Sequence, residues 1–245
     1  MSHLEGKIAL VTGASRGIGK AIATQLAEQG ATVIGTATSD TGAAAITDYL
    51  SASGGKGLAL NVTDKDSVET AIKEIAASYG GIDILVNNAG ITRDNLLMRM
   101  KESEWQDIMD TNLTAIFTLS KAVLRGMMKK RFGRIVNIGS VVGSSGNAGQ
   151  ANYAAAKAGV MALTRCAALE AADFGVRINA VAPSLAMHPF LSKVIDEDTL
   201  EQMTKQEAFG RSAEVWEVSN VMVFLASDLS SYMTGETVSV SNQRA

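Results

Sequence analysis

The sequence predicts a doubly wound α/β fold, in which helices cover both faces of a seven-stranded parallel sheet. Short runs rich in β-branched residues alternate with longer amphipathic stretches, and the short runs are mostly apolar, as in strands buried on both faces. Glycine is abundant (23 residues) and proline is scarce (2 residues), which suits tight turns between strands and closely packed helices. The 245 residues contain no linker, repeat or low-complexity tract, so we expect a single domain over residues 1–245.

The expected strands and helices alternate along most of the chain. Strands are expected at residues 7–12, 31–36, 56–61, 82–87, 133–139, 176–181 and 237–240. Helices are expected from the first glycine turn to residue 29 and over residues 43–51, 64–79, 102–131 and 153–174, with polar residues 64–67 capping the third. The segment from Pro183 to Arg211 is the least regular and contains both prolines. Because ligands in such sheets bind beyond the carboxyl ends of the strands, we expect residues 184–211 to form a flap over the substrate.

Composition and charge exclude several classes of protein. A formal net charge of −3 gives no reason to expect nucleic acid or an acidic membrane as a partner. No apolar run approaches the roughly 20 residues that cross a bilayer, and the N-terminus lacks the apolar stretch of a signal peptide. The single cysteine, Cys166, is typical of a packing residue in an apolar helix. The single cysteine and the lack of such apolar runs lead us to expect a cytoplasmic protein. His3 and His188 lie far apart without neighbouring ligands at metal spacing, so we expect no metal site.

A glycine-rich turn, TGASRGIG at residues 12–19, follows the first strand directly and opens the first helix. Such a turn by itself fits a bend that needs positive φ about as well as it fits a phosphate site. Its place between strand and helix favours the phosphate site, because glycines let backbone amides and the helix N-terminus approach a dinucleotide pyrophosphate. The candidate cofactor-binding residues in the turn are Gly13, Ser15, Arg16, Gly17, Ile18 and Gly19.

The end of the second strand indicates which dinucleotide is bound. NAD enzymes usually carry an Asp or Glu about 20 residues beyond the glycine turn, where it binds the ribose 2′-hydroxyl. Residues 35–39 are neutral here, and Asp40 lies slightly beyond them. Arg16 and Thr38 are suited to a 2′-phosphate, one by charge and one by hydrogen bonding, although Arg16 also fits an ordinary solvated arginine. The pattern therefore predicts NADPH rather than NADH.

Tyr153 and Lys157 stand four residues apart in an expected helix, and Ser140 follows the fifth strand. The spacing places the tyrosine and the lysine on one helix face, one turn apart. An ammonium near a phenol stabilises the phenolate, so we expect the pKa of Tyr153 to lie below its usual value of about 10. Each residue alone is typical of an ordinary helix face or turn. Combined with the glycine turn, the three predict a redox enzyme that moves a proton beside a hydride acceptor.

These motifs together resemble the short-chain dehydrogenase/reductase family over essentially the whole chain. The resemblance rests on TGASRGIG, on NNAG at residues 87–90, on Asn112 and on the Ser140, Tyr153 and Lys157 set. Up to about residue 158 the chain is more similar still to bacterial 3-oxoacyl-[acyl-carrier-protein] reductases, through ITRDNLLMRM, GRIVNIGSVVG and GQANYAAAKAG. The resemblance implies a Rossmann fold, NADPH-dependent reduction of a 3-oxoacyl thioester in fatty acid biosynthesis, and a homotetramer.

The resemblance also implies a role for each site residue. Tyr153 protonates the substrate carbonyl oxygen, Ser140 stabilises that oxygen, and Lys157 lowers the tyrosine pKa and holds the nicotinamide ribose. Asn112 anchors a water that connects Lys157 to solvent. The residues expected to line the adenosine side are Asn88, Ala89 and Gly90, with Asn61 and Val62 beside the adenine.

The C-terminal third departs from the family pattern. The stretch from Pro183 to His188 lacks the usual Pro-Gly and the threonine after it, and residues 239–245 lack the usual Gly-Gly. Arg131 is a candidate for docking the acidic carrier protein, but residues 172–175 lack the second basic residue. From about residue 167 the chain looks more like actinobacterial reductases of coenzyme A thioesters. Two alternatives therefore stay open: a coenzyme A thioester reductase or hydroxysteroid-type dehydrogenase, and a non-catalytic NADP-binding member.

Overall fold

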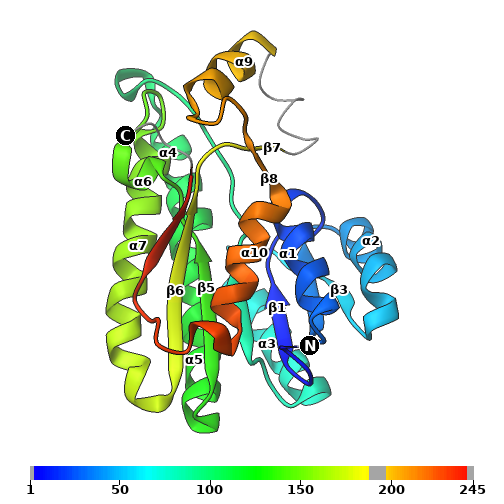
Figure 1. Ribbon diagram of the computed structural model, residues 1–245. Helices are drawn as coiled ribbons and strands as arrows, with labels where there is room; N and C mark the ends of the chain where they lie inside the picture. Colours follow the sequence, from blue (N-terminus) through cyan, green and yellow to red (C-terminus); the bar gives the residue numbers. More distant parts are fainter. Residues whose placement is uncertain (1–2, 188–196, 242–245) are drawn as a thin grey trace.

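The structure is a computed structural model that describes residues 3–187 and 197–241, and its centre is a seven-stranded parallel sheet (Figure 1). The strand order is β3-β2-β1-β4-β5-β6-β9, so successive strands are added on one side of β1 up to β3 and on its other side from β4 onward. This order confirms the doubly wound topology, and it places a ligand crevice at the carboxyl ends of β1 and β4. The strands are β1 (Ile8–Val11), β2 (Thr32–Ala37), β3 (Lys56–Ala59), β4 (Ile84–Asn87), β5 (Gly133–Ile138), β6 (Val176–Pro183) and β9 (Thr237–Val240).

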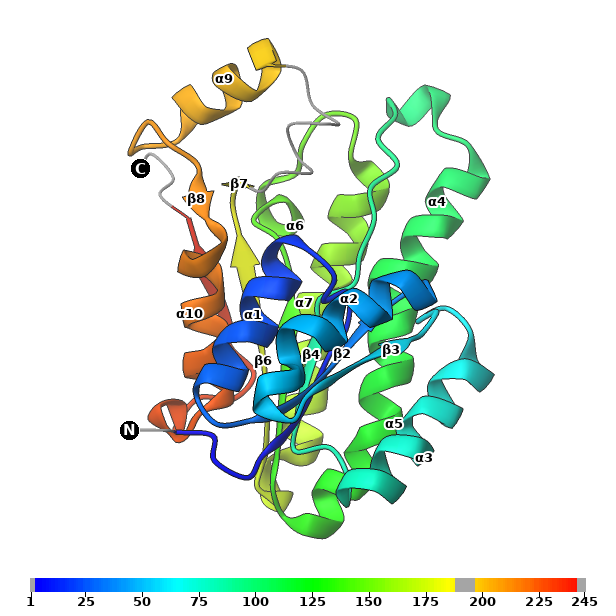
Figure 2. The ribbon, with the colours of Figure 1, turned by 90° about the vertical axis from the view of Figure 1, so that its right-hand side faces the viewer.

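Helices cover both faces of the sheet, as the two views show (Figures 1 and 2). Alternate strand residues point to opposite faces, so Val11 packs into one hydrophobic core and Leu10 into the other. The first core is closed by α1 (Gly17–Glu28), α2 (Asp40–Leu50) and α10 (Val215–Ala226). The second core is closed by α3 (Lys65–Tyr79), α5 (Ala115–Lys130) and α7 (Ala151–Ala171).

Two helix starts differ in how closely they follow the expected caps. α2 begins at Asp40, three residues earlier than expected, because the Ser39 side chain accepts a hydrogen bond from the amide of Gly42 at 3.1 Å. For α3 the expected cap is confirmed, since Asp64 accepts hydrogen bonds from the amides of Asp66 and Ser67. A local side-chain cap therefore sets both starts.

The expected long helix over residues 102–131 is interrupted. α4 (Glu102–Met109) passes into a π-helical turn, η3 (Asp110–Thr114), before α5 begins. Helical periodicity alone does not reveal a π turn, because one wider turn shifts the apolar stripe only slightly. Asn112 lies inside this turn and is completely buried.

Part of the expected flap lies outside the described residues, namely 188–196, which include His188. In the described part, β7 (Ala186–Met187) pairs with β8 (Ala213–Glu214), and α9 (Glu197–Gln206) lies beyond the carboxyl ends of the strands (Figure 1). Ser184 replaces the usual glycine without left-handed backbone. Its amide donates to the Val240 carbonyl at 3.0 Å and its hydroxyl to a Glu207 carboxylate oxygen at 3.3 Å.

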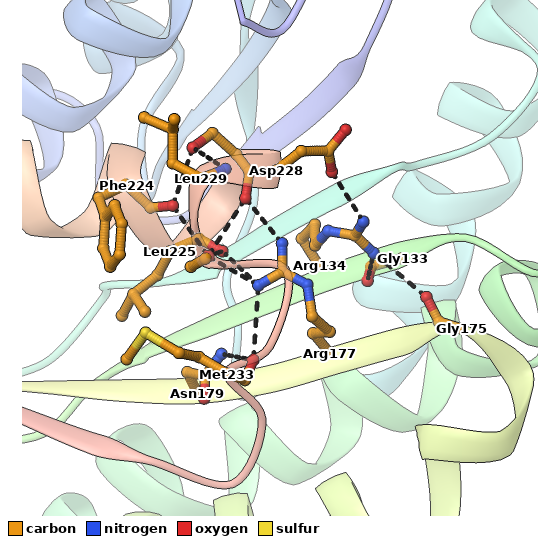
Figure 3. A network of polar contacts seen from close by, with 12 residues as sticks. Gly133, Arg134, Gly175, Arg177, Asn179, Phe224, Leu225, Asp228, Leu229 and Met233 are labelled. Atoms are coloured by element: carbon orange, nitrogen blue, oxygen red, sulfur yellow. Dashed lines mark hydrogen bonds and ion pairs between the residues drawn. The ribbon is translucent and has the colours of Figure 1, made fainter.

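Two buried arginines lie near the amino ends of the neighbouring strands β5 and β6, at the end of the sheet away from the glycine turn (Figure 3). Arg134 of β5 and Arg177 of β6 are register partners. Arg177 donates to carbonyl oxygens of the α10 C-terminus and the turn that follows it, whereas Arg134 pairs with the exposed Asp228 at 3.1 Å. Burial first, and Arg134 second, lower the pKa of Arg177 to about 10, so it stays charged at neutral pH. This cluster joins α10 to the turn before β9.

Within the described part of the chain, no helix is both long enough and apolar enough to cross a membrane.

Candidate active site

The glycine turn is held in place by the segment that follows β4. The Thr12 hydroxyl accepts hydrogen bonds from the amides of Asn88 and Ala89, both at 3.0 Å. The Asn88 side-chain amide donates to the carbonyls of Thr12 (2.9 Å) and Gly13 (3.1 Å). Asn88 therefore holds the backbone at the start of the turn, while Gly90 is exposed. Sequence analysis missed the role of Thr12, a buried hydroxyl at the last position before the glycines.

The turn has the shape that a dinucleotide pyrophosphate needs. Gly13 and Gly17 have φ of +67° and +57°, which other residues rarely adopt. A Cβ at Gly19 would overlap the Gly13 carbonyl oxygen and the Asn88 side chain. α1 begins at Gly17 with no side-chain cap hydrogen bond and no acidic residue in its first turn, and the positive end of its dipole favours an anion. These residues fit a bound phosphate group.

The residues expected at the adenosine side differ in how they are placed. Arg16 and Thr38 are both exposed, the first as the N-cap residue of α1 and the second directly after β2. The Asn61 side-chain oxygen accepts from the amide and hydroxyl of Thr63 at 3.1 Å and 2.9 Å, so it shapes the local turn. Val62 packs into the second core, which leaves its backbone, rather than its side chain, to border an adenine.

Ser140, Tyr153 and Lys157 meet at the carboxyl end of β5. Ser140 lies two residues beyond the strand and hydrogen-bonds the Tyr153 hydroxyl. Lys157, one turn further along α7, is buried and donates from Nζ to the carbonyl of Ile138 at 2.6 Å. Its Nζ lies 5.6 Å from the centre of the Tyr153 ring. The proton-transfer set predicted from the sequence is therefore assembled in space.

The expected lowering of the Tyr153 pKa is wrong for this structure. Burial raises the pKa of Tyr153, the Ser140 hydrogen bond opposes that rise, and the Asp94 carboxylate adds to it. Burial also lowers the pKa of Lys157 to about 8. Spacing places the ammonium correctly but does not reveal the burial of both groups. A raised phenol pKa keeps Tyr153 protonated, as a proton donor to a carbonyl must be.

Asn112 contacts the segment after β4 rather than Lys157. Its side-chain oxygen accepts from the Ile91 amide at 2.9 Å, and its side-chain nitrogen donates to the Ile91 carbonyl at 2.8 Å. The π turn packs against α7, because Leu113 lies against Gly159, where a Cβ would come within 2.9 Å of its side chain. The side chain of Asn112 thus holds the loop after β4 through Ile91. Because both of its polar atoms are used there, a water that connects Lys157 to solvent would need to bind a backbone group of the π turn.

Asn152 is a second residue of the site that sequence analysis missed. It is completely buried in the first turn of α7 and donates to the carbonyls of Arg93 (3.0 Å) and Glu104 (3.1 Å). Its own side-chain oxygen accepts from the amide of Tyr153 at 2.7 Å. It therefore links the loop after β4 and α4 to the start of α7 beside Tyr153. An asparagine directly before Tyr153 in an otherwise apolar stretch was the available signal.

A parallel sheet with a phosphate turn after β1 and a Ser-Tyr-Lys set after β5 defines a nicotinamide-dependent oxidoreductase. Residues 13–242 match the protein family described as enoyl-(acyl carrier protein) reductase. The chain belongs to the short-chain dehydrogenase/reductase family.

Curated relatives from several bacteria carry the name 3-oxoacyl-[acyl-carrier-protein] reductase. The protein of Vibrio cholerae serotype O1 is 61% identical over 238 residues, and that of Escherichia coli K12 is 57% identical over 238 residues; each match covers 97% of both chains. The protein of Pseudomonas aeruginosa is 52% identical over 239 residues, which is 97% of this chain and 96% of the relative. The matches include most of the atypical C-terminal third.

Proposed function

We propose that the protein reduces a 3-oxoacyl-[acyl-carrier-protein] to the 3-hydroxyacyl thioester in fatty acid biosynthesis, with NADPH as reductant. The observation that carries the proposal is that Ser140, the partly buried Tyr153 and the buried Lys157 come together at the carboxyl ends of the strands, where the glycine turn also lies. The names of relatives that match 97% of the chain support the substrate class.

Each residue of the set has one task in the proposed reaction. NADPH, when bound, supplies the hydride. The Tyr153 hydroxyl donates its proton to the substrate carbonyl oxygen, while the Ser140 hydroxyl hydrogen-bonds that oxygen as negative charge develops. Lys157 stabilises the phenolate that remains and holds the nicotinamide ribose. The π turn at Asn112 is the proposed start of the water relay that returns a proton to the site.

The preference for NADPH rests on charge at the adenosine side. The exposed Arg16 and Thr38 are the proposed ligands of the 2′-phosphate, and Asn61, Val62 and residues 88–90 are proposed to border the adenosine. Comparing kcat/KM for NADPH and NADH tests this, and a preference for NADH would contradict it.

The carrier of the acyl group is settled by assaying acetoacetyl-[acyl-carrier-protein] and acetoacetyl-coenzyme A side by side. We expect faster NADPH oxidation with the carrier-protein substrate. Faster turnover of the coenzyme A thioester would favour the alternative that the C-terminal third suggested. A crotonyl-[acyl-carrier-protein] arm tests reduction of a carbon-carbon double bond, and we expect no turnover of this substrate.

Tyr153→Phe tests the proposed proton donor. Removing the hydroxyl leaves no acid at the carbonyl oxygen, so kcat should fall by about 10²- to 10⁴-fold. The Kd of NADPH, measured by fluorescence titration, should change little, because the phosphates bind at the glycine turn. Tyr232→Phe is the matched control, since that side chain is fully exposed. Near-normal turnover in Tyr153→Phe would refute the assignment.

We also propose that the segment 184–211 covers the substrate.

The protein is further proposed to be a homotetramer whose interfaces use α4, α5 and α7. Large apolar side chains are exposed on these three helices, namely Trp105, Phe117 and Leu169. Light scattering of the purified protein tests the tetramer, and a monomeric mass would exclude it.

A further inference from the structure

Tyr49 is a partly buried residue of α2 with no part in the chemistry proposed above. Its hydroxyl donates a hydrogen bond of 2.8 Å to the carbonyl of Ala14, in the middle of the glycine turn. Ala14 is completely buried, and the candidate phosphate-binding residues Ser15, Arg16 and Gly17 follow it directly. The contact thus joins a helix on the first face of the sheet to the backbone of the turn.

The same stretch of backbone is held from the opposite side by β2. The Ala14 amide donates to the Thr36 carbonyl at 2.8 Å, and the Gly13 amide lies 3.4 Å from the Thr36 hydroxyl. β2, α2 and the turn are closely packed at Gly35, because a Cβ there would come within 2.7 Å of Ile46 and 2.8 Å of Ala14. Strand, helix and turn are therefore in direct contact, and the Tyr49 hydroxyl is the polar link from the helix.

The Tyr49 ring itself is fixed. It packs against the first core, and the Nζ of Lys20 in α1 lies 4.9 Å from the ring centre. Tyr49 thus touches both the turn and the helix whose N-terminus faces the pyrophosphate site. Burial raises the pKa of the Tyr49 phenol, so the hydroxyl remains a donor at any pH used for assays.

We propose that Tyr49 is a positioning residue for dinucleotide binding. Its hydrogen bond to Ala14 fixes the turn so that the amides after Ala14 and the N-terminus of α1 face the pyrophosphate together. The proposal rests on the proposed function, because it assumes that NADPH binds at this turn. Tyr49 acts through the backbone of Ala14 and lies outside the Ser140, Tyr153 and Lys157 set. Its loss should therefore weaken nucleotide binding and leave the chemical step unchanged.

The test is Tyr49→Phe with Tyr79→Phe as matched control. Tyr79 is also partly buried at the end of a helix and also has a lysine over its ring, Lys56 at 5.8 Å, but it packs into the second core away from the turn. We expect Tyr49→Phe to raise the Kd and KM of NADPH by about 2- to 10-fold, the effect of one lost hydrogen bond. We expect kcat at saturating NADPH to stay unchanged, and Tyr79→Phe to leave both constants unchanged.

The outcomes separate the two proposals. Unchanged Kd and KM in Tyr49→Phe, or a fall in kcat and melting temperature with unchanged Kd, would overturn the positioning role. An equal rise in Kd for Tyr79→Phe would overturn it as well, since the effect would then be general loosening. If the unmodified protein fails to bind NADPH in the same titration, the proposed function fails and the positioning role fails with it.

Discussion

Tyr153 and Lys157 have pKa values displaced in opposite directions by the same cause. Removal from water disfavours the phenolate and the ammonium alike, so the pKa of Tyr153 rises and that of Lys157 falls to about 8. In the direction of carbonyl reduction this is useful, because the tyrosine starts protonated. The ammonium of Lys157 is then the group whose charge is lost first as pH rises.

The alkaline limb of activity should report Lys157. A pKa lowered to about 8 means that the ammonium is present below pH 8 and is lost above it. The phenolate then loses its stabilising charge, so kcat/KM for NADPH should fall by about tenfold per pH unit above 8. Measuring the profile from pH 6 to pH 10, with circular dichroism to confirm that the protein stays folded, checks this. A flat profile to pH 10 would contradict it.

The Ser140, Tyr153 and Lys157 set could be predicted from the sequence. Helical spacing puts Tyr153 and Lys157 on one face of a helix, and Ser140 follows a predicted strand. The sequence did not predict the partners of Asn112 and Asn152, whose hydrogen bonds run to backbone atoms 21 and 59 residues away. Such contacts depend on how loops are folded across the sheet edge, and no local pattern records them.

At the scale of elements, α1 and the glycine turn are fitted to each other through Gly19. A Cβ at this position would overlap the Gly13 carbonyl and the Asn88 side chain, so Gly19→Ala must push the helix away from the turn. We expect the free energy of unfolding to fall by about 1–3 kcal/mol and NADPH affinity to fall with it. Urea denaturation and fluorescence titration measure the two effects.

Gly126→Ala is the control for that substitution. Gly126 lies within α5, is exposed, and has no atom within 4 Å of an added Cβ. Alanine there should stabilise the protein by about 0.5–1 kcal/mol, because the unfolded chain loses freedom. An equal loss of stability in Gly126→Ala would show that the effect of Gly19→Ala is not specific to close packing. A Gly19→Ala that is as stable as the unmodified protein and binds NADPH normally would contradict the role of that packing.

At the scale of the whole molecule, the doubly wound parallel sheet followed from the alternating pattern of strands and helices, because parallel strands need helical crossovers that cover both faces. The π turn and the positions of β7 and β8 did not follow. β7 and β8 have two residues each, and their pairing brings together segments about 27 residues apart. The pairing of the buried arginines could not be predicted either, because Arg134 and Arg177 lie in separate strands whose register the sequence alone does not give.

Arg177 should be important for the stability of the sheet as a whole, because it joins β6 to α10 and to the turn before β9. Its guanidinium donates to the carbonyls of Leu225 (3.3 Å) and Ser227 (2.7 Å) and to the Ser230 hydroxyl (2.8 Å). It also neutralises the C-terminal end of the α10 dipole. Arg177→Met would remove these charge-assisted hydrogen bonds and leave the Leu225 and Ser227 carbonyls with only the contacts from Ser230, so the free energy of unfolding should fall by about 3 kcal/mol.

Asp228→Asn tests the same cluster from its exposed side. Asp228 is 77% exposed, so losing its ion pair with Arg134 should cost less than about 1 kcal/mol. Urea denaturation of both variants gives the comparison, and kcat of the folded protein should be unchanged in each, because the cluster lies at the edge of the sheet opposite the site. Equal losses in the two variants would contradict the prediction that the buried hydrogen bonds of Arg177 contribute more than the exposed ion pair.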